Sequence, residues 1–122
     1  MNIEEVREYC LSLPMATEDF PFDDVILVFR VFGKIFAFLS LDGSGWFALK
    51  CAPDYALELR EVYPEIRGAF HMNKKYWNQV DLQGDLSNDF IEGLIRHSYS
   101  QVVKKFSKKL IAENPIISTV QE

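Results

Sequence analysis

The chain has 122 residues, of which 48% are hydrophobic and 14% aromatic, and this is enough apolar material for one domain with a buried core. Its formal net charge is −5, which at first sight argues against a nucleic-acid partner. No apolar run approaches the roughly 18 residues of a membrane span, and the acidic start at residues 1–5 is unlike a signal peptide. We therefore expect a cytoplasmic, monomeric protein that does not enter membranes.

The charge is distributed unevenly along the chain. Residues 1–24 hold seven acidic side chains and one basic one, whereas residues 96–112 hold five basic side chains and no acidic one. The molecule is therefore expected to be a dipole, with cations gathered near its C-terminal end. A polyanion can bind such a chain only if these cations act together on one face.

The two cysteines, Cys10 and Cys51, lie far apart in the sequence and have no metal-binding spacing. We predict that both are buried free thiols, and that the protein needs no disulfide, zinc site or cofactor. Gly43 and Gly45 likewise lack the spacing and the Lys-Ser/Thr pair of a phosphate-binding loop, so they are interpreted as turn residues.

The first part of the chain predicts a helix followed by an antiparallel meander. Apolar residues at positions 3, 6, 10 and 13 share one helical face, and Pro14 ends that helix. Residues 15–24 are then expected to form a loop or an edge strand packed by Phe20 and Phe22. Three strands follow at 25–32, 35–41 and 46–50, and the Gly-Lys pair at 33–34 suits a type II′ hairpin turn.

A second helix is predicted over residues 53–62, because a proline stands in its first turn and another proline follows its end. Residues 69–71 and 76–80 are predicted to be two short strands of a hairpin. Asn73 supplies the positive backbone dihedral that a tight turn needs.

The tip of this hairpin crowds cationic and aromatic residues together. Lys74 and Lys75 lie at the turn, and Tyr76 and Trp77 follow at once. Successive strand residues point to opposite faces, which favours a buried Trp77 and an exposed Tyr76 able to stack beside a cation.

A long third helix is predicted to begin at the capping residues 87–89 and to extend to Leu110. On its outer side Lys104 and Lys108 share one stripe and Lys105 lies beside it, which makes a basic ridge. We interpret residues 1–112 as a single domain and residues 113–122 as a flexible tail.

Five segments of the chain, taken together, resemble one protein family. They are Pro-x-Ala-Thr-Glu-Asp-Phe-Pro-Phe (residues 14–22), Gly-Lys-x-Phe-Ala (33–37), Leu-Lys (49–50), His-Met-Asn-Lys-Lys-x-Trp (71–77) and Ser-Tyr (98–99). Over residues 2–110 the chain is similar to the MmcQ/YjbR family of small bacterial proteins. The resemblance implies an α+β fold of the frataxin/CyaY-like kind, with an antiparallel sheet, hairpin wings and helices packed on one face. It also implies a double-wing DNA-binding domain without established enzymatic activity.

The chain departs from the family pattern at two places. Family members often have a glycine-containing turn where this chain has Asp23 and Asp24, so its N-terminal edge is more acidic and less suited to a polyanion. They often carry a second histidine where this chain has Tyr76. His71 is left without a neighbouring histidine, and a two-histidine metal site loses support.

Two groups of residues could support chemistry other than phosphate binding. His71 could act as a general base, but no serine, cysteine or paired carboxylate accompanies it at a recognisable spacing, so no enzyme is predicted. Glu18, Asp19, Asp23 and Asp24 could bind a hard cation, as the acidic surfaces of frataxin-like proteins bind iron, although the EF-hand spacing is absent.

The leading hypothesis is a nucleic-acid-binding module that contacts phosphates and binds DNA weakly and with little sequence preference. Lys34 belongs to it as the tip of the second wing that the resemblance implies. The candidate residues are Lys34, His71, Asn73, Lys74, Lys75, Tyr76, Lys104, Lys105 and Lys108. The alternatives are a protein-interaction or small-ligand domain that binds an acidic partner, and frataxin-like metal binding at the acidic N-terminal edge.

Overall fold

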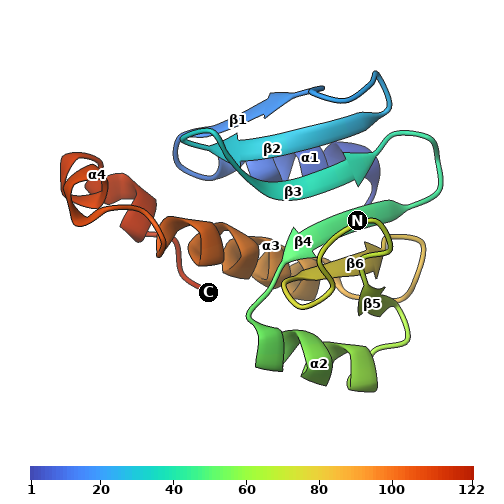
Figure 1. The fold of residues 1–122 in the computed structure, drawn as a ribbon. Helices are drawn as coiled ribbons and strands as arrows, with labels where there is room; N and C mark the ends of the chain where they lie inside the picture. The colour runs from blue at the N-terminus through green and yellow to red at the C-terminus, as the bar shows by residue number, and fades with distance from the viewer.

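The structure, a computed structural model, describes residues 1–122 and shows one antiparallel sheet of six strands with helices on one of its faces (Figure 1). The strands are β1 (Ala16–Asp19), β2 (Ile26–Val31), β3 (Lys34–Ser40), β4 (Trp46–Lys50), β5 (Ile66–Gly68) and β6 (Trp77–Asp81), in the spatial order β1-β2-β3-β4-β6-β5. The helices are α1 (Ile3–Ser12), α2 (Pro53–Val62), α3 (Asn88–Val103), α4 (Lys108–Glu113) and a 3₁₀ turn at Pro115–Ser118. The predicted α+β fold is confirmed.

The first three helices begin at start signals in their local sequence, which are a capping side chain or a proline in the first turn. Asn2 and Glu5 form a reciprocal capping box at α1, Pro53 occupies the first turn of α2, and Ser87 accepts a hydrogen bond from the Phe90 amide at α3. These signals place the first two helices within a residue of the predicted positions.

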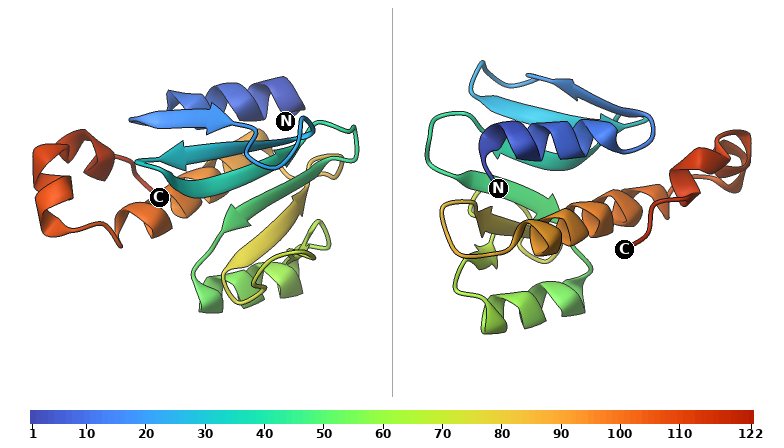
Figure 2. Two further views of the ribbon diagram at one scale, coloured as in Figure 1. Left: turned by 45° about the horizontal axis from the view of Figure 1, so that its top comes forward. Right: turned by 180° about the vertical axis from the view of Figure 1, so that it is seen from behind.

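The two faces of the sheet have different surroundings. Seen from behind, α1 and α3 lie across one face (Figure 2). Between these helices and the sheet lies a cluster of 23 buried residues. Alternate strand positions such as Phe29, Phe47 and Val80 contribute to it. Cys10 and Cys51 belong to this cluster as free thiols, as predicted. No helix covers the opposite face, which we call the open face.

The β2–β3 turn is one residue earlier than predicted. Val31 pairs with Lys34, so Phe32 and Gly33 are the two turn residues, with φ of 46° and 77°. Two successive positive φ values define a type I′ turn and contradict the type II′ prediction. The Phe32 ring packs edge-on against Phe106, 6.0 Å between ring centroids, and Lys34 becomes the first residue of β3.

The hairpin of β5 and β6 is confirmed, but its strands and connection differ from the prediction. Gly68 pairs with Asn78, so residues 69–76 form a loop of their own. Asn73 is not among the residues with positive φ; its side-chain oxygen instead accepts a hydrogen bond from the Lys75 amide at 3.0 Å. An Asx turn therefore shapes the loop in place of a tight strand-to-strand turn.

The third helix is shorter than predicted and ends at Val103. The amides of Lys105 and Phe106 bond to carbonyls three residues back, which tightens and ends the helix, and Ser107 caps α4. Lys108 thus begins a separate helix and does not share the α3 stripe with Lys104. The single helix to Leu110 was a wrong prediction.

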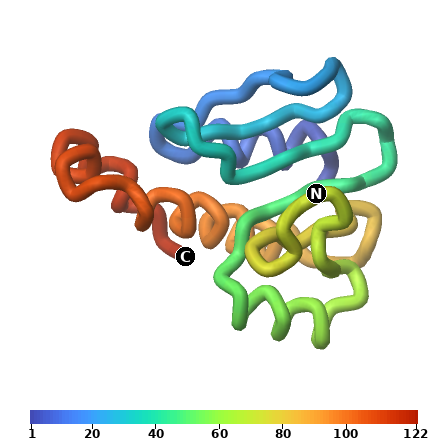
Figure 3. The backbone as a smooth tube through the Cα atoms, viewed as in Figure 1, coloured from blue at the N-terminus to red at the C-terminus, as the bar shows by residue number.

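Residues 113–122, predicted to be a flexible tail, return to α3 after α4 projects beyond the sheet (Figure 3). Ile117 is buried, and the Arg96 guanidinium donates a hydrogen bond to the Gln121 carbonyl at 2.7 Å. Glu122 accepts from His97, whose other ring nitrogen accepts from the Ala52 amide, so His97 has a structural role. None of the helices combines the length and apolar character that a membrane crossing requires.

Candidate functional site

Five lysines gather at the end of the sheet where β3 begins and β4 and α3 end. We call this cluster the basic end; it consists of Lys34, Lys50, Lys75, Lys104 and Lys105. Its members come from four separate segments of the chain, so only the fold brings them together. Figure 1 shows the β2–β3 turn, the end of β4 and the end of α3 on the same side of the molecule.

The proximity of these lysines shows in the electrostatics of Lys50. Burial lowers the pKa of its ammonium group, and the positive charges of Lys105, Lys104 and Lys34 lower it further. Like charges therefore face one another here without a compensating carboxylate. The three ion pairs of the chain, Arg7–Glu18, Arg30–Asp19 and His97–Glu122, include no lysine.

Tyr76 connects the 69–76 loop to the end of α3. The ammonium groups of Lys75 and Lys105 each lie 5.5 Å from the centroid of its ring, within the range of cation–π attraction. The contact brings a lysine of this loop and a lysine just after α3 to the same ring. Tyr76 thus contacts two cations from separate segments of the chain.

A buried serine fixes the strand ends that carry Lys34 and Lys50. The Ser98 hydroxyl donates to the Phe36 carbonyl at 2.5 Å and accepts from the Lys50 amide at 2.8 Å. It thus bridges β3 and β4 where their direct pairing stops at Ala37 and Leu49. The neighbouring Tyr99 hydroxyl donates to the Pro14 carbonyl at 2.6 Å. The Ser-Tyr pair of the family pattern is therefore structural.

The remaining candidate residues lie elsewhere. Lys74 turns away from Lys75 and lies over the Phe70 ring at 5.7 Å, while Arg60 donates to the Lys74 carbonyl. His71 and Asn73 line a groove on the open face. Lys108 lies on α4 and makes no side-chain hydrogen bond or ion pair.

Lys50 belongs to the basic end but was not among the predicted site residues. The signal that could have found it is strand alternation across β4 and β6. Lys50 pairs with Trp77, so both side chains lie on the open face. Trp77 itself is half-buried on that face and is absent from the core cluster, which contradicts its predicted core position.

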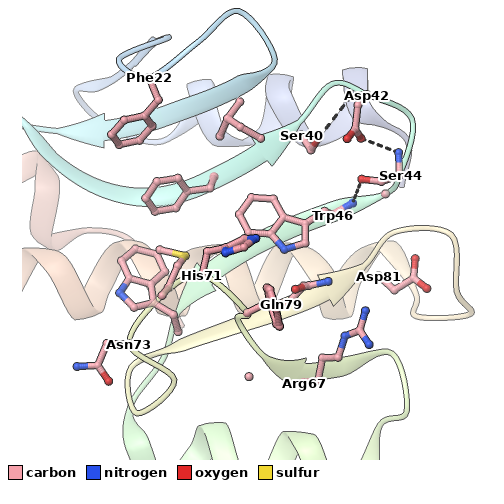
Figure 4. Close-up of a pocket in the computed structure, with 17 residues that line it drawn as sticks. Phe22, Ser40, Asp42, Ser44, Trp46, Arg67, His71, Asn73, Gln79 and Asp81 are labelled. Atoms are coloured by element: carbon pink, nitrogen blue, oxygen red, sulfur yellow. Dashed lines mark hydrogen bonds between the residues drawn. The ribbon is translucent and has the colours of Figure 1, made fainter.

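The open face carries a groove of about 960 Å³ with an aromatic wall, which we call the aromatic groove (Figure 4). Five aromatic residues line it: Phe22, Phe38, Trp46, Phe70 and Trp77. Phe38 is central, since its ring centroid lies 5.3 Å from Trp77, 6.3 Å from Phe22 and 6.5 Å from Trp46. Phe22 and Phe70 are 68% and 71% exposed, so their rings are available to a ligand.

Polar side chains line the rest of the aromatic groove. Arg67, Gln79 and His71 make no side-chain hydrogen bond within the chain, so their donors and acceptors are free. Asp81 accepts from the Gln83 amide, and Asp42 accepts from the Ser44 amide. Figure 4 shows both carboxylates at one end of the groove and Asn73 at the other.

The acidic N-terminal edge is occupied by internal contacts. Glu18 forms an ion pair with Arg7, and Asp19 forms one with Arg30 at 2.8 Å. Asp23 accepts hydrogen bonds from the amides of residues 25 and 26, which lower its pKa. No three histidine, cysteine or acidic side chains come close enough to hold a metal ion.

A family model described as YjbR matches residues 11–101, most of the chain. The chain belongs to the YjbR family. The matched range contains all six strands and most of α3, and it ends just before Lys104 and Lys105. Among relatives, YbdF of Escherichia coli O157:H7 is 34% identical over 107 residues, which cover 87% of this chain and 88% of that protein. YjbR of Escherichia coli K12 is 31% identical, over 84% of this chain and 88% of that protein.

Two solved structures share the fold. The crystal structure of the Deinococcus radiodurans protein DR2400, described as a DUF419 domain, superposes with a TM-score of 0.85 at 35% identity and covers 92% of this chain and 86% of its own. A protein from Pseudomonas syringae superposes with a TM-score of 0.72 at 28% identity, over 83% of this chain and 98% of its own. These matches show that the arrangement of strands and helices is shared with solved structures.

Proposed function

We propose that this YjbR-family protein binds nucleic acid, and that the basic end contacts the phosphates. The observation that supports the proposal is the gathering of five lysines without a carboxylate partner in a chain of net charge −5. An anion that binds between these lysines lowers the free energy of the complex, because its phosphate neutralises positive charge that the fold leaves uncompensated. The acids of the N-terminal edge do not compete, since arginines and backbone amides already engage Glu18, Asp19 and Asp23.

We propose nucleic-acid binding without a catalysed reaction. His71 has no hydrogen-bonded nucleophile or carboxylate, which a general base would require. Lysine is a compact point charge that contacts phosphate and does not select bases. We therefore expect affinities on the order of 10⁻⁴ to 10⁻⁶ M at physiological salt, with little sequence preference.

Salt dependence tests the proposal directly. If three to five phosphates are contacted, log K should fall with log salt at a slope of roughly −3 to −4.5 for duplex DNA. Fluorescence anisotropy of a labelled oligonucleotide, titrated with protein at several salt concentrations from about 50 mM upward, measures this slope. Absence of binding at the lowest salt concentration would contradict the proposal and leave an acidic protein as the partner of the basic end.

A matched pair of double variants separates the basic end from general charge. Lys75→Glu with Lys105→Glu reverses the two cations beside Tyr76, and binding should be lost. Lys108→Glu with Lys109→Glu makes the same change in net charge on α4, outside the cluster, and binding should be largely kept. Equal loss in both variants would show that net charge alone controls binding. All four lysines are exposed, so both variants should fold with nearly unchanged stability.

A further inference from the structure

The open face of the sheet is unusually aromatic for a surface that no helix covers. A sheet face in contact with water is normally polar, with apolar residues reserved for the packed face. Here Phe38, Trp46 and Trp77 occupy the open face, and the β1–β2 loop adds Phe22. Contiguous exposed aromatic surface of this kind marks a binding site more often than a structural feature.

The chemistry of the aromatic groove suits a flat heteroaromatic ring. Its volume of about 960 Å³ lies within the range of ligand sites, and its aromatic wall offers ring faces for stacking. Gln79 presents both a donor and an acceptor, and Arg67 presents a planar fork of donors beside it, because the two residues pair across β5 and β6. A nucleobase has both complementary features, a π-face and an edge with donors and acceptors.

The charges of the groove favour a base over a phosphate. Asp42 and Asp81 stand at one end of it, and they would repel a phosphate placed there. The phosphate-binding charge lies outside the groove, at the basic end. The two sites adjoin, since Lys50 pairs with Trp77 on the open face. The 69–76 loop also contributes to both, His71 to the groove and Lys75 to the basic end.

We infer that the aromatic groove holds unstacked nucleobases while the basic end holds their phosphates, so that the nucleic acid this protein binds is single-stranded. This inference rests on the proposed function and specifies its ligand class. In a duplex the base faces are stacked and their pairing edges are occupied, so a duplex can use the lysines but not the groove. Single strands expose both, and aromatic stacking tolerates any sequence.

The test compares a labelled single strand of about 12 nucleotides with the duplex of the same sequence, by anisotropy at low salt. The single strand should bind more tightly. The two tryptophans of the chain, Trp46 and Trp77, both line the groove, so intrinsic fluorescence reports on it directly. The single strand should change this fluorescence, and the duplex should leave it nearly unchanged.

Two phenylalanines of the β1–β2 loop provide a matched pair of variants. Phe22→Ala removes an exposed ring from the groove and should weaken single-strand binding about 5- to 150-fold, with the salt slope unchanged. Phe20→Ala removes a ring of the same kind that does not line the groove, and it should bind like the wild type. Equal unfolding midpoints of the two variants will show that neither effect comes from misfolding.

The outcomes separate the two proposals. If both nucleic-acid forms bind equally, without a fluorescence change and without an effect of Phe22→Ala, the groove inference fails and the basic end stands. If neither the single strand nor the duplex binds, both proposals are overturned. A weaker single-strand affinity that appears equally in Phe20→Ala contradicts the groove, because loop packing would then explain it.

Discussion

The two faces of the sheet are formed by the same strands, but one face packs against helices and the other carries the aromatic groove. In β3, Phe36 is fully buried and packs edge-on against Tyr99 at 5.4 Å, while Phe38, two residues on, lines the aromatic groove. The pairing of β2 and β3 shifts by one residue at Phe36, because Phe29 pairs with Ala37 and Arg30 with Ile35. The helix-covered face leaves no buried side-chain polar atom without a partner.

On the open face, several polar side chains have no hydrogen-bond partner within the chain. Arg67, Gln79 and His71 make no side-chain hydrogen bond, and Lys50 is repelled by its neighbours. A folded chain gains little stability from such groups, and selection for stability alone would not place them together. Stability thus resides on the covered face and binding capacity on the open one, and variants on the two faces can test that division.

The largest expected effect is on the covered face. Phe36→Ala should lower the free energy of unfolding by about 3–5 kcal/mol, because it removes a fully buried ring and leaves a cavity beside Tyr99. Urea unfolding measures the loss. The control is Phe22→Ala on the open side, which should cost less than about 1 kcal/mol because that ring is mostly exposed. Similar losses in the two variants would erase the distinction between the faces.

Much of the covered face could be predicted from the sequence, because local signals determine it. Helical spacing and Pro14 define α1, the proline in the first turn defines α2, and the run of β-branched and aromatic residues gives the meander. The positions that failed are those where packing overrides local preference. Phe32 takes the positive φ of the β2–β3 turn, which a bulky residue rarely adopts, while its ring packs against Phe106.

The open face was harder to predict. Strand alternation places successive side chains on opposite faces of the sheet, but it does not identify the face that packs against the core. The predicted core position of Trp77 is wrong, and its cross-strand partner Lys50 is not among the predicted site residues. The loop, helix and turn lysines were found by their charge. That Lys75 and Lys105 meet at Tyr76 depends on the end of α3 at Val103, which has no strong sequence signal apart from the Ser107 cap.

The second prediction sharpens the role of the covered face in positioning the basic end. Ser98→Ala should cost about 1–3 kcal/mol, since the Lys50 amide and the Phe36 carbonyl would lose their shared partner in a buried place. Ser100→Ala, two residues along α3, is the control, because that side chain makes no hydrogen bond. The expected difference appears in the urea midpoint, and equal midpoints would show that the bridge adds nothing.

The third prediction concerns alkaline pH and two buried acidic groups of the covered face. Burial raises the pKa of Cys51 from 9.0 to about 11 and that of Tyr99 from 10.0 to about 12. The folded state therefore keeps protons that the unfolded state releases, so stability is fully present below about pH 9 and is lost as pH rises toward 12. The loss should be about 2–3 kcal/mol per group once the pH has passed its folded-state pKa. Urea midpoints across this range test it, and Cys51→Ala should make the decline shallower.

The smallest expected effect is on the open face and has the opposite sign. Lys50→Met keeps the apolar stem that packs beside Trp77 and removes a charge that Lys34, Lys104 and Lys105 repel. Stability should rise slightly, by no more than about 0.5 kcal/mol, and the gain should shrink as salt screens the repulsion. Thermal unfolding at low and high salt measures both parts. Under the proposed function, nucleic-acid affinity should fall in the same variant, because Lys50 belongs to the basic end that is proposed to contact phosphates. A variant that loses stability at low salt would instead show that Lys50 supports the fold, and the division between the two faces would not hold at this residue.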